Sequence, residues 1–456
     1  MRSLFEIAKS GLQSSQRSLS VTSNNIVNAD TPGYSRQRVE KSPNGMQIDG
    51  FHAGLGVNID DVSRLRDGMN DVLLNKKQQD LGYLEKKSEI YEKLEATMVT
   101  DYGEDLDSQI GGLFDNFSEL ASNPQDVSVR NNLINETQQF NSKLHEMSRS
   151  IDETGNLVQN FAGKTLDSIN SLLNNINELN HSIKQSEAKG QPDHSSMDLR
   201  VAKLQELSEL VDFESQVTDT GAVQIEIGGH KVLDEDQAYN IRAEIDDVNK
   251  KFRLRLNNGY VIEPQGGKIG AEIEMYEEGI PEIKKKLNNI ASTVVTEINN
   301  LHSSGYGLED NTQRAFFDPA GTTAENIKLN QAIVDNPRHL AASDTAGEEG
   351  NGEVASQIAN LRNEKIIGDS TTNQRLTEYT VGIISKPGEE LSALSSAIEA
   401  RDSEIQMLKR QQEETAGVNI DEELSRMIKF QNAYQGAAKV MSSAQQMYDT
   451  LISIVR

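Results

Sequence analysis

The chain has 456 residues, no cysteine and no tryptophan, and a formal net charge of −26 at pH 7. Without cysteine it cannot form a disulfide, a thiolate nucleophile or a cysteine-ligated metal site. Nucleic acid is an improbable partner for so acidic a chain, because phosphate binding requires a basic surface. The charge is uneven, since residues 1–50 hold six Lys or Arg against four Asp or Glu and residues 418–456 hold four of each. Near-neutral ends favour segments that pack against copies of themselves.

The amino-terminal segment is predicted to be a helix with a thin apolar stripe. From Phe5 to Ile26, apolar and small residues alternate at spacings of 3 and 4, which is the period of a helix face that meets a partner helix. Asp30 to Gly33 then ends the helix, since proline cannot continue it and glycine permits a turn. The segment lacks the continuous apolar core of a secretory signal, and no stretch of about 20 apolar residues predicts a membrane span.

The carboxyl-terminal segment shows the same period over a longer distance. Apolar residues from Ile420 to Val455 follow one another at spacings of 4 and 3, without a proline. Because each stripe needs a partner, we expect the two ends to pair as a coiled coil, and many polar positions favour ends that fold only on assembly. The predicted seam residues, at which the terminal helices pack against each other or against neighbouring subunits, are Phe5, Leu12, Leu19, Ile26, Ile420, Leu424, Met427, Tyr434, Met441, Tyr448 and Ile452.

The middle of the chain is predicted to be a bundle of long helices interrupted by β-structure. A heptad pattern runs from Leu133 to Leu179, whereas strict alternation, as in Val223 to Ile227, indicates strands. Helix is expected to resume at Pro281, and the last body helix to begin after Pro387. The predicted divisions are residues 1–35 (terminal helix), 36–64 (short strands and linker), 65–211 (helical bundle, first half), 212–275 (inserted β-rich domain), 276–417 (bundle, second half, irregular near 303–352) and 418–456 (terminal helix). The fold class is therefore mainly α with a β-rich insertion, in an elongated multidomain subunit.

The sequence carries no convincing catalytic or cofactor motif. Gly266 to Lys268 does not complete a phosphate-binding loop, and the seven histidines include no pair at metal-ligand spacing. The acidic run from Asp101 to Asp107 lacks the glycine and glutamate of a calcium loop. We therefore expect no enzymatic activity, no cofactor and no metal, and an assembly function instead.

Motifs at both ends resemble a known family. The stretch Ser23-Asn-Asn-Ile-Val-Asn-Ala-Asp-Thr-Pro-Gly-Tyr-Ser-Arg-Gln37 resembles the amino-terminal motif of the flagellar rod, hook and hook-associated proteins. Asn419-Ile-Asp-Glu-Glu423, followed by Gln431 and Tyr434, resembles the carboxyl end of the hook-associated members of that family. The motif residues are Asn24, Asn25, Asn28, Thr31, Pro32, Gly33, Tyr34 and Arg36 at the first end, and Asn419, Asp421, Glu422, Glu423, Gln431 and Tyr434 at the second.

The resemblance implies a structural adaptor that joins the flagellar hook to the filament and is required for filament assembly. It implies terminal helices paired in the inner core of a tube, and export by the flagellar type III apparatus to the outside of the cell without a cleaved signal peptide. The implied partners are copies of the chain in a ring, the hook protein on one side, the next hook-associated protein and filament on the other, and an export chaperone on residues 418–456. Asn24, Asn25 and Asn28 are expected to make polar contacts between subunits, because amides are poor helix formers.

Two other interpretations remain open from the sequence. The chain could be another axial protein, such as the hook subunit, since the terminal motifs are shared within the family. Alternatively, the insertion at residues 212–275 could have a binding or enzymatic activity of its own, although it lacks a set of residues for one.

Overall fold

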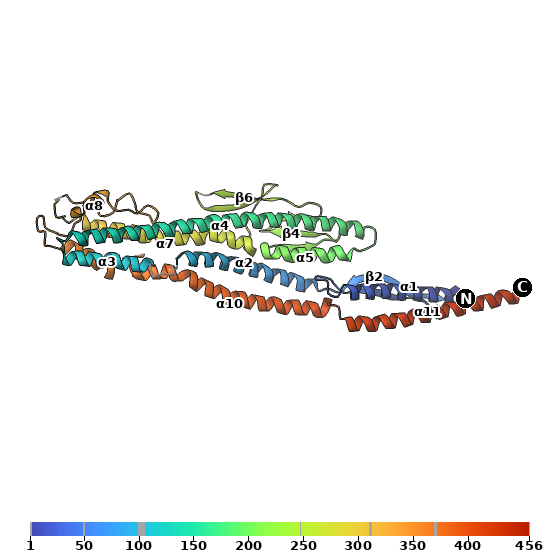
Figure 1. Ribbon diagram of the computed structural model, residues 1–456. Helices are drawn as coiled ribbons and strands as arrows, with labels where there is room; N and C mark the ends of the chain where they lie inside the picture. The colour runs from blue at the N-terminus through green and yellow to red at the C-terminus, as the bar shows by residue number, and fades with distance from the viewer. Residues whose placement is uncertain are drawn as a thin grey trace.

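The computed structural model describes residues 2–48, 51–98, 105–246, 248–309, 312–368 and 372–455. The molecule is long and narrow, with a helical body at one end and a thinner terminal region at the other (Figure 1). Both ends of the chain lie at the tip of the terminal region, so the chain leaves that tip, traverses the body and returns.

The body consists of long helices that run along the axis of the molecule (Figure 1). The longest, α4, spans 61 residues and follows the predicted heptad pattern without a break. The side chain of Asp126 accepts a hydrogen bond from the backbone N–H of Ser128, which caps the amino end of α4. Residues such as Phe140, Ile151 and Ile176 are fully buried along its inner face. The body helices are α2 (Gly68–Met98), α3 (Leu106–Ser122), α4 (Val127–Glu187), α5 (His194–Leu210), α6 (Gly267–Glu274), α7 (Ile280–His302), α9 (Glu353–Asn360) and α10 (Leu376–Ala416).

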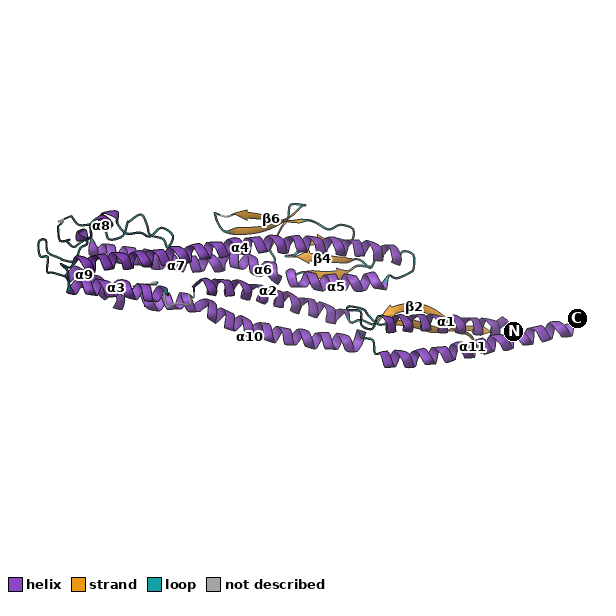
Figure 2. Cartoon of the chain, in the orientation of Figure 1, coloured by secondary structure: helices purple, strands orange, loops and turns teal. Residues whose placement is uncertain are grey.

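Two small antiparallel sheets lie beside α4; in Figure 2, β6 is on the outer side of α4 and β4 on its other side, next to α5. One orders its strands β3-β4-β5 and the other β6-β7-β8. Two asparagines of α4 dock them, because Asn180 pairs with the backbone of Val223 and Asn170 with that of Ile241, through two hydrogen bonds each. The strands are β3 (Glu214–Val217), β4 (Val223–Ile227), β5 (His230–Leu233), β6 (Ile241–Asp246), β7 (Lys251–Leu256) and β8 (Val261–Ile262).

The prediction that helix resumes at Pro281 is wrong. Helix begins at Gly267, passes through a π-helical turn at Met275–Gly279 and continues directly into α7. Proline lacks an N–H and would break an ordinary helix interior, whereas here it occupies the first turn of α7, directly after the wider π turn. The inserted β-structure therefore gives way to helix before residue 275.

The last body helix also begins earlier than predicted. α10 starts at Leu376 and contains Pro387, which is buried inside the helix. Between α7 and α9 the chain is irregular, as expected, and forms α8 (Gln331–Asp335), a 3₁₀ turn (Pro337–His339) and isolated bridges. This segment still has a core, since Phe316 and Phe317 are fully buried and stack edge to face. A further 3₁₀ turn (Leu361–Asn363) and the strands β9 (Lys365–Ile367) and β10 (Gln374–Arg375) precede α10.

The terminal region contains α1 (Arg2–Val27), α11 (Ile420–Val455) and a hairpin of β1 (Gln37–Ile48) and β2 (Phe51–Arg64). The hairpin replaces the short separate strands that the sequence predicted. Pro43 and the nearby glycines do not divide it, because register shifts at Glu40/Lys41 and Asn44/Gly45 absorb the irregularity. Figure 1 shows the hairpin lying along α1, which places α1 between the hairpin and α11.

Candidate functional site

The two terminal helices meet at a buried polar joint built on Asn25. Its side-chain N–H groups donate to the backbone O of Gln37 (3.0 Å) and to the carboxylate of Glu423 (3.0 Å). Its side-chain O accepts from the backbone N–H of Gln37 (3.0 Å) and from the hydroxyl of Tyr34 (2.8 Å). Asn25 therefore ties α1, the start of the hairpin and α11 together, and its own amide is satisfied within one chain.

Arg36 completes this joint by binding α11 through its side chain and the end of α10 through its backbone. Its guanidinium donates to the carboxylate of Glu423 (2.9 and 2.6 Å) and lies 3.0 Å from that of Glu422, while its backbone N–H bonds to the O of Ala416 (3.0 Å). Glu423 is only 1% exposed, so its charge needs these partners. Burial, followed by the negative charges of Asp198 and Glu423, raises the pKa of Tyr34 to about 12, and its hydroxyl stays protonated as a donor.

A second polar cluster joins the terminal region to the body. The carboxylate of Asp198 on α5 accepts from the backbone N–H (3.1 Å) and hydroxyl (2.7 Å) of Ser35 and from Arg64 of β2 (2.7 Å). Arg66 donates to the same Ser35 hydroxyl (3.1 Å) and forms a bidentate pair with Asp71 of α2. We call these five residues the Asp198 cluster. Gln412 of α10 also donates to Asp71 (2.7 Å), so segments from both halves of the body converge on one joint.

The interface between α1 and α11 is made of small residues. An ideal Cβ on Gly11 would lie 3.4 Å from the Cβ of Ala437, and Asn25 bonds Glu423, so the helices are antiparallel and close. On the same face of α1, from Ala8 to Asn25, the positions at heptad spacing are small or hydroxylic side chains, and small side chains permit close approach of two helices. These buried residues are Ala8, Ser15, Ser18 and Thr22.

Within one chain the predicted seam residues are only partly covered, so their expected contacts with neighbouring subunits stay a prediction. The interface lies one position to the side of the apolar stripe, on the face marked by Gly11, Ser18 and Asn25. Leu12, Leu19 and Ile26 are only half-buried, and on α11 the same is true of Met427 and Met441. The remaining predicted seam residues are largely exposed within one chain, at 37–53%: Phe5, Ile420, Leu424, Tyr434, Tyr448 and Ile452. Many bulky apolar side chains thus lie exposed or only half-buried, while small residues form the closest contact.

The other family-motif residues lie around the joint. Asn28 donates to the backbone and side-chain O of Asn24 (2.9 Å each) and accepts from Thr31, while Asn24 donates to Tyr34, so the predicted intersubunit amides are engaged within the chain. Pro32 and Gly33 form the turn, where Gly33 has a φ of 79°. Asn419 caps α11 by accepting from the backbone of Glu422. Asp421 and Gln431 lie exposed on α11.

Sequence reasoning missed the Asp198 cluster and Gln412. Ser35 lies 163 residues from Asp198, and Asp71 lies 341 residues from Gln412, so no local pattern links them. Ser35 lies inside the amino-terminal family motif, and this was the only sequence feature that pointed to the Asp198 cluster. No group of three or more metal-binding side chains occurs in the described residues, which omit 101–104 of the acidic run considered above. Within the same residues, no helix is long and apolar enough to cross a membrane.

The paired terminal helices, fixed to a long helical body, have counterparts in known families. Residues 5–34 match the flagellar basal body rod protein family, and residues 410–454 match the carboxyl-terminal family of the flagellar basal body rod FlgEFG proteins. These matches define the class as a flagellar axial protein. Residues 91–317 match the helical domain of flagellar hook-associated protein FlgK. The chain belongs to the flagellar hook-associated protein 1 family and is a structural component of the flagellar hook–filament junction.

Similar proteins span the whole chain. It is 25% identical to flagellar hook-associated protein 1 of Bacillus subtilis, over 98% of this chain and 97% of that protein. It is 20% identical to the protein of the same name from Salmonella typhimurium, over 100% of both. The structure of the flagellar hook junction protein FlgK from Burkholderia pseudomallei is similar with a TM-score of 0.65 at 12% identity, over 75% of this chain and 99% of that one, which establishes a shared fold.

Proposed function

We propose that this chain acts as an adaptor ring, in which copies of it bind the hook on one side and the next hook-associated protein on the other. The observation that carries the proposal is how α1 and α11 pack. They contact each other through small residues and leave most of their large apolar side chains exposed to solvent. Exposed apolar surface on paired helices favours further association. Large exposed apolar residues of the terminal helices are Leu4, Phe5, Val27, Ile420, Leu424, Ile428, Tyr434, Val440, Met447, Tyr448, Leu451, Ile452 and Ile454.

The acidic body suits the outer layer of such an assembly. Residues 1–50 and 418–456 are near neutral, so the body carries the negative charge. Like charges on the outer surface of the assembly are tolerated because water surrounds them. The same charge on every copy at an inner contact would make the copies repel one another. Membership in a family of structural proteins and an assembly surface together support a role without catalysis.

We also propose that the chain leaves the cell through the flagellar export apparatus and that a chaperone covers α11 beforehand. Until copies assemble, α11 presents a long row of apolar side chains to solvent, which invites premature association. A helix held mainly by a small-residue interface is also easily separated from its partner for unfolded transport.

A deletion strain tests the junction role. Cells without this chain are expected to build hooks and release flagellin as unpolymerised protein, and the intact gene should restore filaments. Electron microscopy counts hooks with filaments, and immunoblotting measures flagellin in the medium. Loss of the hook itself would instead favour a hook or rod subunit, and normal filaments would contradict any junction role.

The insertion could still have a binding activity of its own. Its stacked His230 and Tyr260 rings, with centroids 4.9 Å apart, form an aromatic pair on the two sheets. A variant in which Tyr260 is replaced by Ala should assemble filaments normally if the insertion serves only as an outer covering.

A further inference from the structure

The side of α1 that faces away from α11 forms one wall of a groove. The groove has a volume of about 790 Å³ and lies between α1, the hairpin and the loop before α5. Ser20 and Val27 line it, and each follows a residue of the α1–α11 interface, Ser18 or Asn25, by two positions. Two positions along a helix lead to its opposite side. Val27 is 82% exposed, so this wall of the groove is open to solvent.

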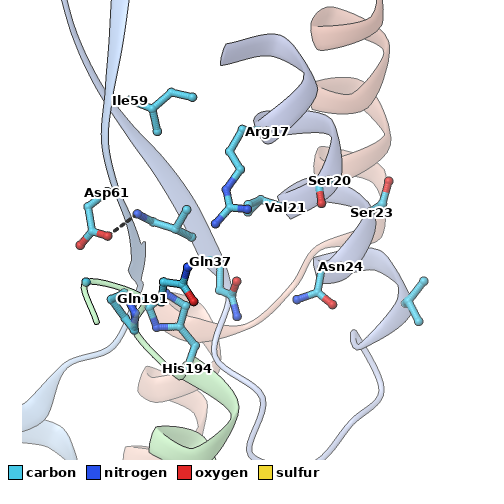
Figure 3. A pocket seen from close by; sticks show the side chains of 14 residues that line it. Arg17, Ser20, Val21, Ser23, Asn24, Gln37, Ile59, Asp61, Gln191 and His194 are labelled. Atoms are coloured by element: carbon cyan, nitrogen blue, oxygen red, sulfur yellow. Dashed lines mark hydrogen bonds between the residues drawn. The ribbon is translucent and has the colours of Figure 1, made fainter. Parts of the chain in front are cut away.

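The lining of the groove combines small and apolar side chains with one cation. Ser20 and Ser23 are small, while Val27 and Ile59 of β2 are apolar. Arg17 extends from α1 toward the middle of the groove (Figure 3), and its side chain has no ion pair within the described residues. The groove therefore offers space, an apolar rim and an unpaired guanidinium to a docking element.

The side of α11 that faces away from α1 bears an exposed apolar edge. Ile428 lies nine positions, or two and a half turns, before Ala437 of the interface, so its side chain is on the opposite side of the helix. Ile428 is 60% exposed, and Leu424, one turn earlier, is 44% exposed. Asn432, one turn later, is also exposed. We call Leu424, Ile428 and Asn432 the α11 edge.

The groove and the α11 edge lie at the same height in the terminal region. The contacts of Gly11 and Asn25 with α11 define one antiparallel register, in which Ile428 is level with Ser20 of the groove. One flank of the helix pair thus carries a groove, and the other flank carries an apolar edge at the same level. Two different patches on opposite flanks form a contact that repeats around a ring when the rotation closes.

We propose that the α11 edge of one copy docks in the groove of the next copy, side by side within a single ring. The proposal rests on the adaptor function above and specifies which faces of neighbouring copies meet. Ile428 then packs against Ser20 of the neighbour, and the side-chain O of Asn432 accepts a hydrogen bond from Arg17. Both ends of the terminal region stay uncovered, so they face the different proteins on the two sides of the ring.

The proposed contact continues an interface that the single chain already forms. Each α1 lies between its own α11 and the α11 of its neighbour, and both partners run antiparallel to it. Small α1 residues permit the close approach on both sides, with Ser15 and Ser18 facing the first partner and Ser20 and Ser23 facing the second. The large side chains of the α11 edge occupy the space that these serines leave.

Cysteine pairs in the full chain, expressed in the deletion strain, test this contact, because the chain has no cysteine of its own. Ser20 and Ile428 of one copy lie on opposite outer sides of the helix pair, whereas a disulfide requires Cα atoms within about 7 Å. S20C/I428C flagella should therefore give a covalent ladder of copies after mild oxidation, read by immunoblotting of a non-reducing gel. In S20C/Q446C the second cysteine lies on the same face of α11 but 18 residues, or roughly 27 Å, further along, and no ladder should form.

A charge on the α11 edge gives a second readout. I428D should lower the fraction of hooks with filaments by about threefold or more, because docking would bury an unpaired carboxylate. The free chain should keep its helix content, since Ile428 is 60% exposed within one copy. V440D is the matched control, because Val440 is 41% exposed and lies off the α11 edge, and it should leave the fraction of hooks with filaments unchanged.

The outcomes separate the docking from the junction role. No ladder from S20C/I428C, a ladder from S20C/Q446C, or equal effects of I428D and V440D would overturn the side-by-side docking even where the deletion strain supports the junction role. Normal filaments in the deletion strain would overturn the junction role itself.

Discussion

Several ionisable side chains are fully buried in the body, and each is kept neutral or held by backbone oxygens. Arg130 of α4 donates to the carbonyl oxygens of Pro124 and Leu340, and burial lowers its pKa to about 10. His302 donates from Nδ1 to Arg314 (2.7 Å) and accepts at Nε2 from Ala341 (2.9 Å), while burial lowers its pKa to about 4. These residues fasten the irregular segment 303–352 to the helices.

Glu272 of α6 is the buried group with the clearest pH effect. Burial raises its pKa from 4.5 to about 7, although Thr165 donates to one carboxylate oxygen (3.0 Å). Because the folded pKa lies above the unfolded one, the folded state holds the extra proton between these values and stability falls as pH rises from about 4.5 to 7. We expect E272Q to remove this loss and to stabilise the chain by about 1–3 kcal/mol at pH 8, with little gain at pH 4.5.

Urea unfolding followed by circular dichroism at the two pH values measures the E272Q effect. E89Q is the matched control, because Glu89 binds the neighbouring Lys86 from a half-exposed position and should change stability by less than about 0.5 kcal/mol. An equal effect of E272Q at both pH values would show that the charge of Glu272 is not the cause.

At the scale of the element, the α1–α11 contact depends on close approach at Gly11. Its ideal Cβ would lie 3.4 Å from that of Ala437, so one methyl group fits but a larger side chain does not. We expect G11A to be neutral or to stabilise α1 by up to about 1 kcal/mol, since alanine is the better helix former. G11L should separate the two helices, increase amide exchange in α11 and reduce filament formation several-fold.

Hydrogen exchange followed by mass spectrometry compares the two Gly11 variants in the purified chain. Q13L, an exposed position on the same helix, controls for the added apolar side chain. If G11L and Q13L behave alike, close packing at Gly11 is not what holds the pair.

The terminal helices are also expected to be the least protected elements of the free chain. Their interface consists of small polar residues, whereas α4 buries Phe140, Leu144 and Ile151 along one continuous core. Burial of large apolar side chains is what raises the cost of local opening. Amide exchange should therefore be fast in α1 and α11 and slow in α4 of the free chain. Equal protection in all three would contradict folding on assembly.

The positions of helices could be predicted where the apolar residues recur with a regular helical period. Which face of each helix is buried could not. The part of α4 from Leu133 to Leu179 was predicted because its apolar stripe is wide and strongly buried, whereas both ends of the 61-residue helix extend beyond that pattern. The stripe predicted for α1 held both Leu12 and Ser15, but the seam was assigned to its large residues. The side chain of Ser15 is buried and that of Leu12 only half-buried, because burial there is decided by how closely two backbones approach. Proline was taken as a helix boundary at two places. Helix instead runs through the π turn before Pro281, and Pro387 lies inside α10.

At the scale of the whole molecule, the sequence predicted an elongated subunit with paired ends but not the joint that sets its shape. Glu423 lies 398 residues from Asn25, and Asp198 lies 163 from Ser35, so neither pairing leaves a local trace. The motif resemblance identified residues at the first joint without saying what they bind. The Asp198 cluster became visible only when α5, the hairpin and the link after α1 were placed together.

The Asp198 cluster is the joint that should hold the terminal region at a fixed angle to the body. Replacing Asp198 by Ala leaves the positively charged Arg64 without its carboxylate and Ser35 without its acceptor, in a site where both are largely buried. Removing one partner of such a pair costs about 3 kcal/mol locally, so the terminal region should swing relative to an intact body. Small-angle X-ray scattering should show a broader distribution of interatomic distances with a shorter maximum for D198A, with unchanged helix content by circular dichroism.

E206A, which removes an exposed carboxylate paired with Lys203 on the same helix, should scatter like the parent. Identical scattering of D198A and E206A would mean that the helices and hairpin alone fix the angle.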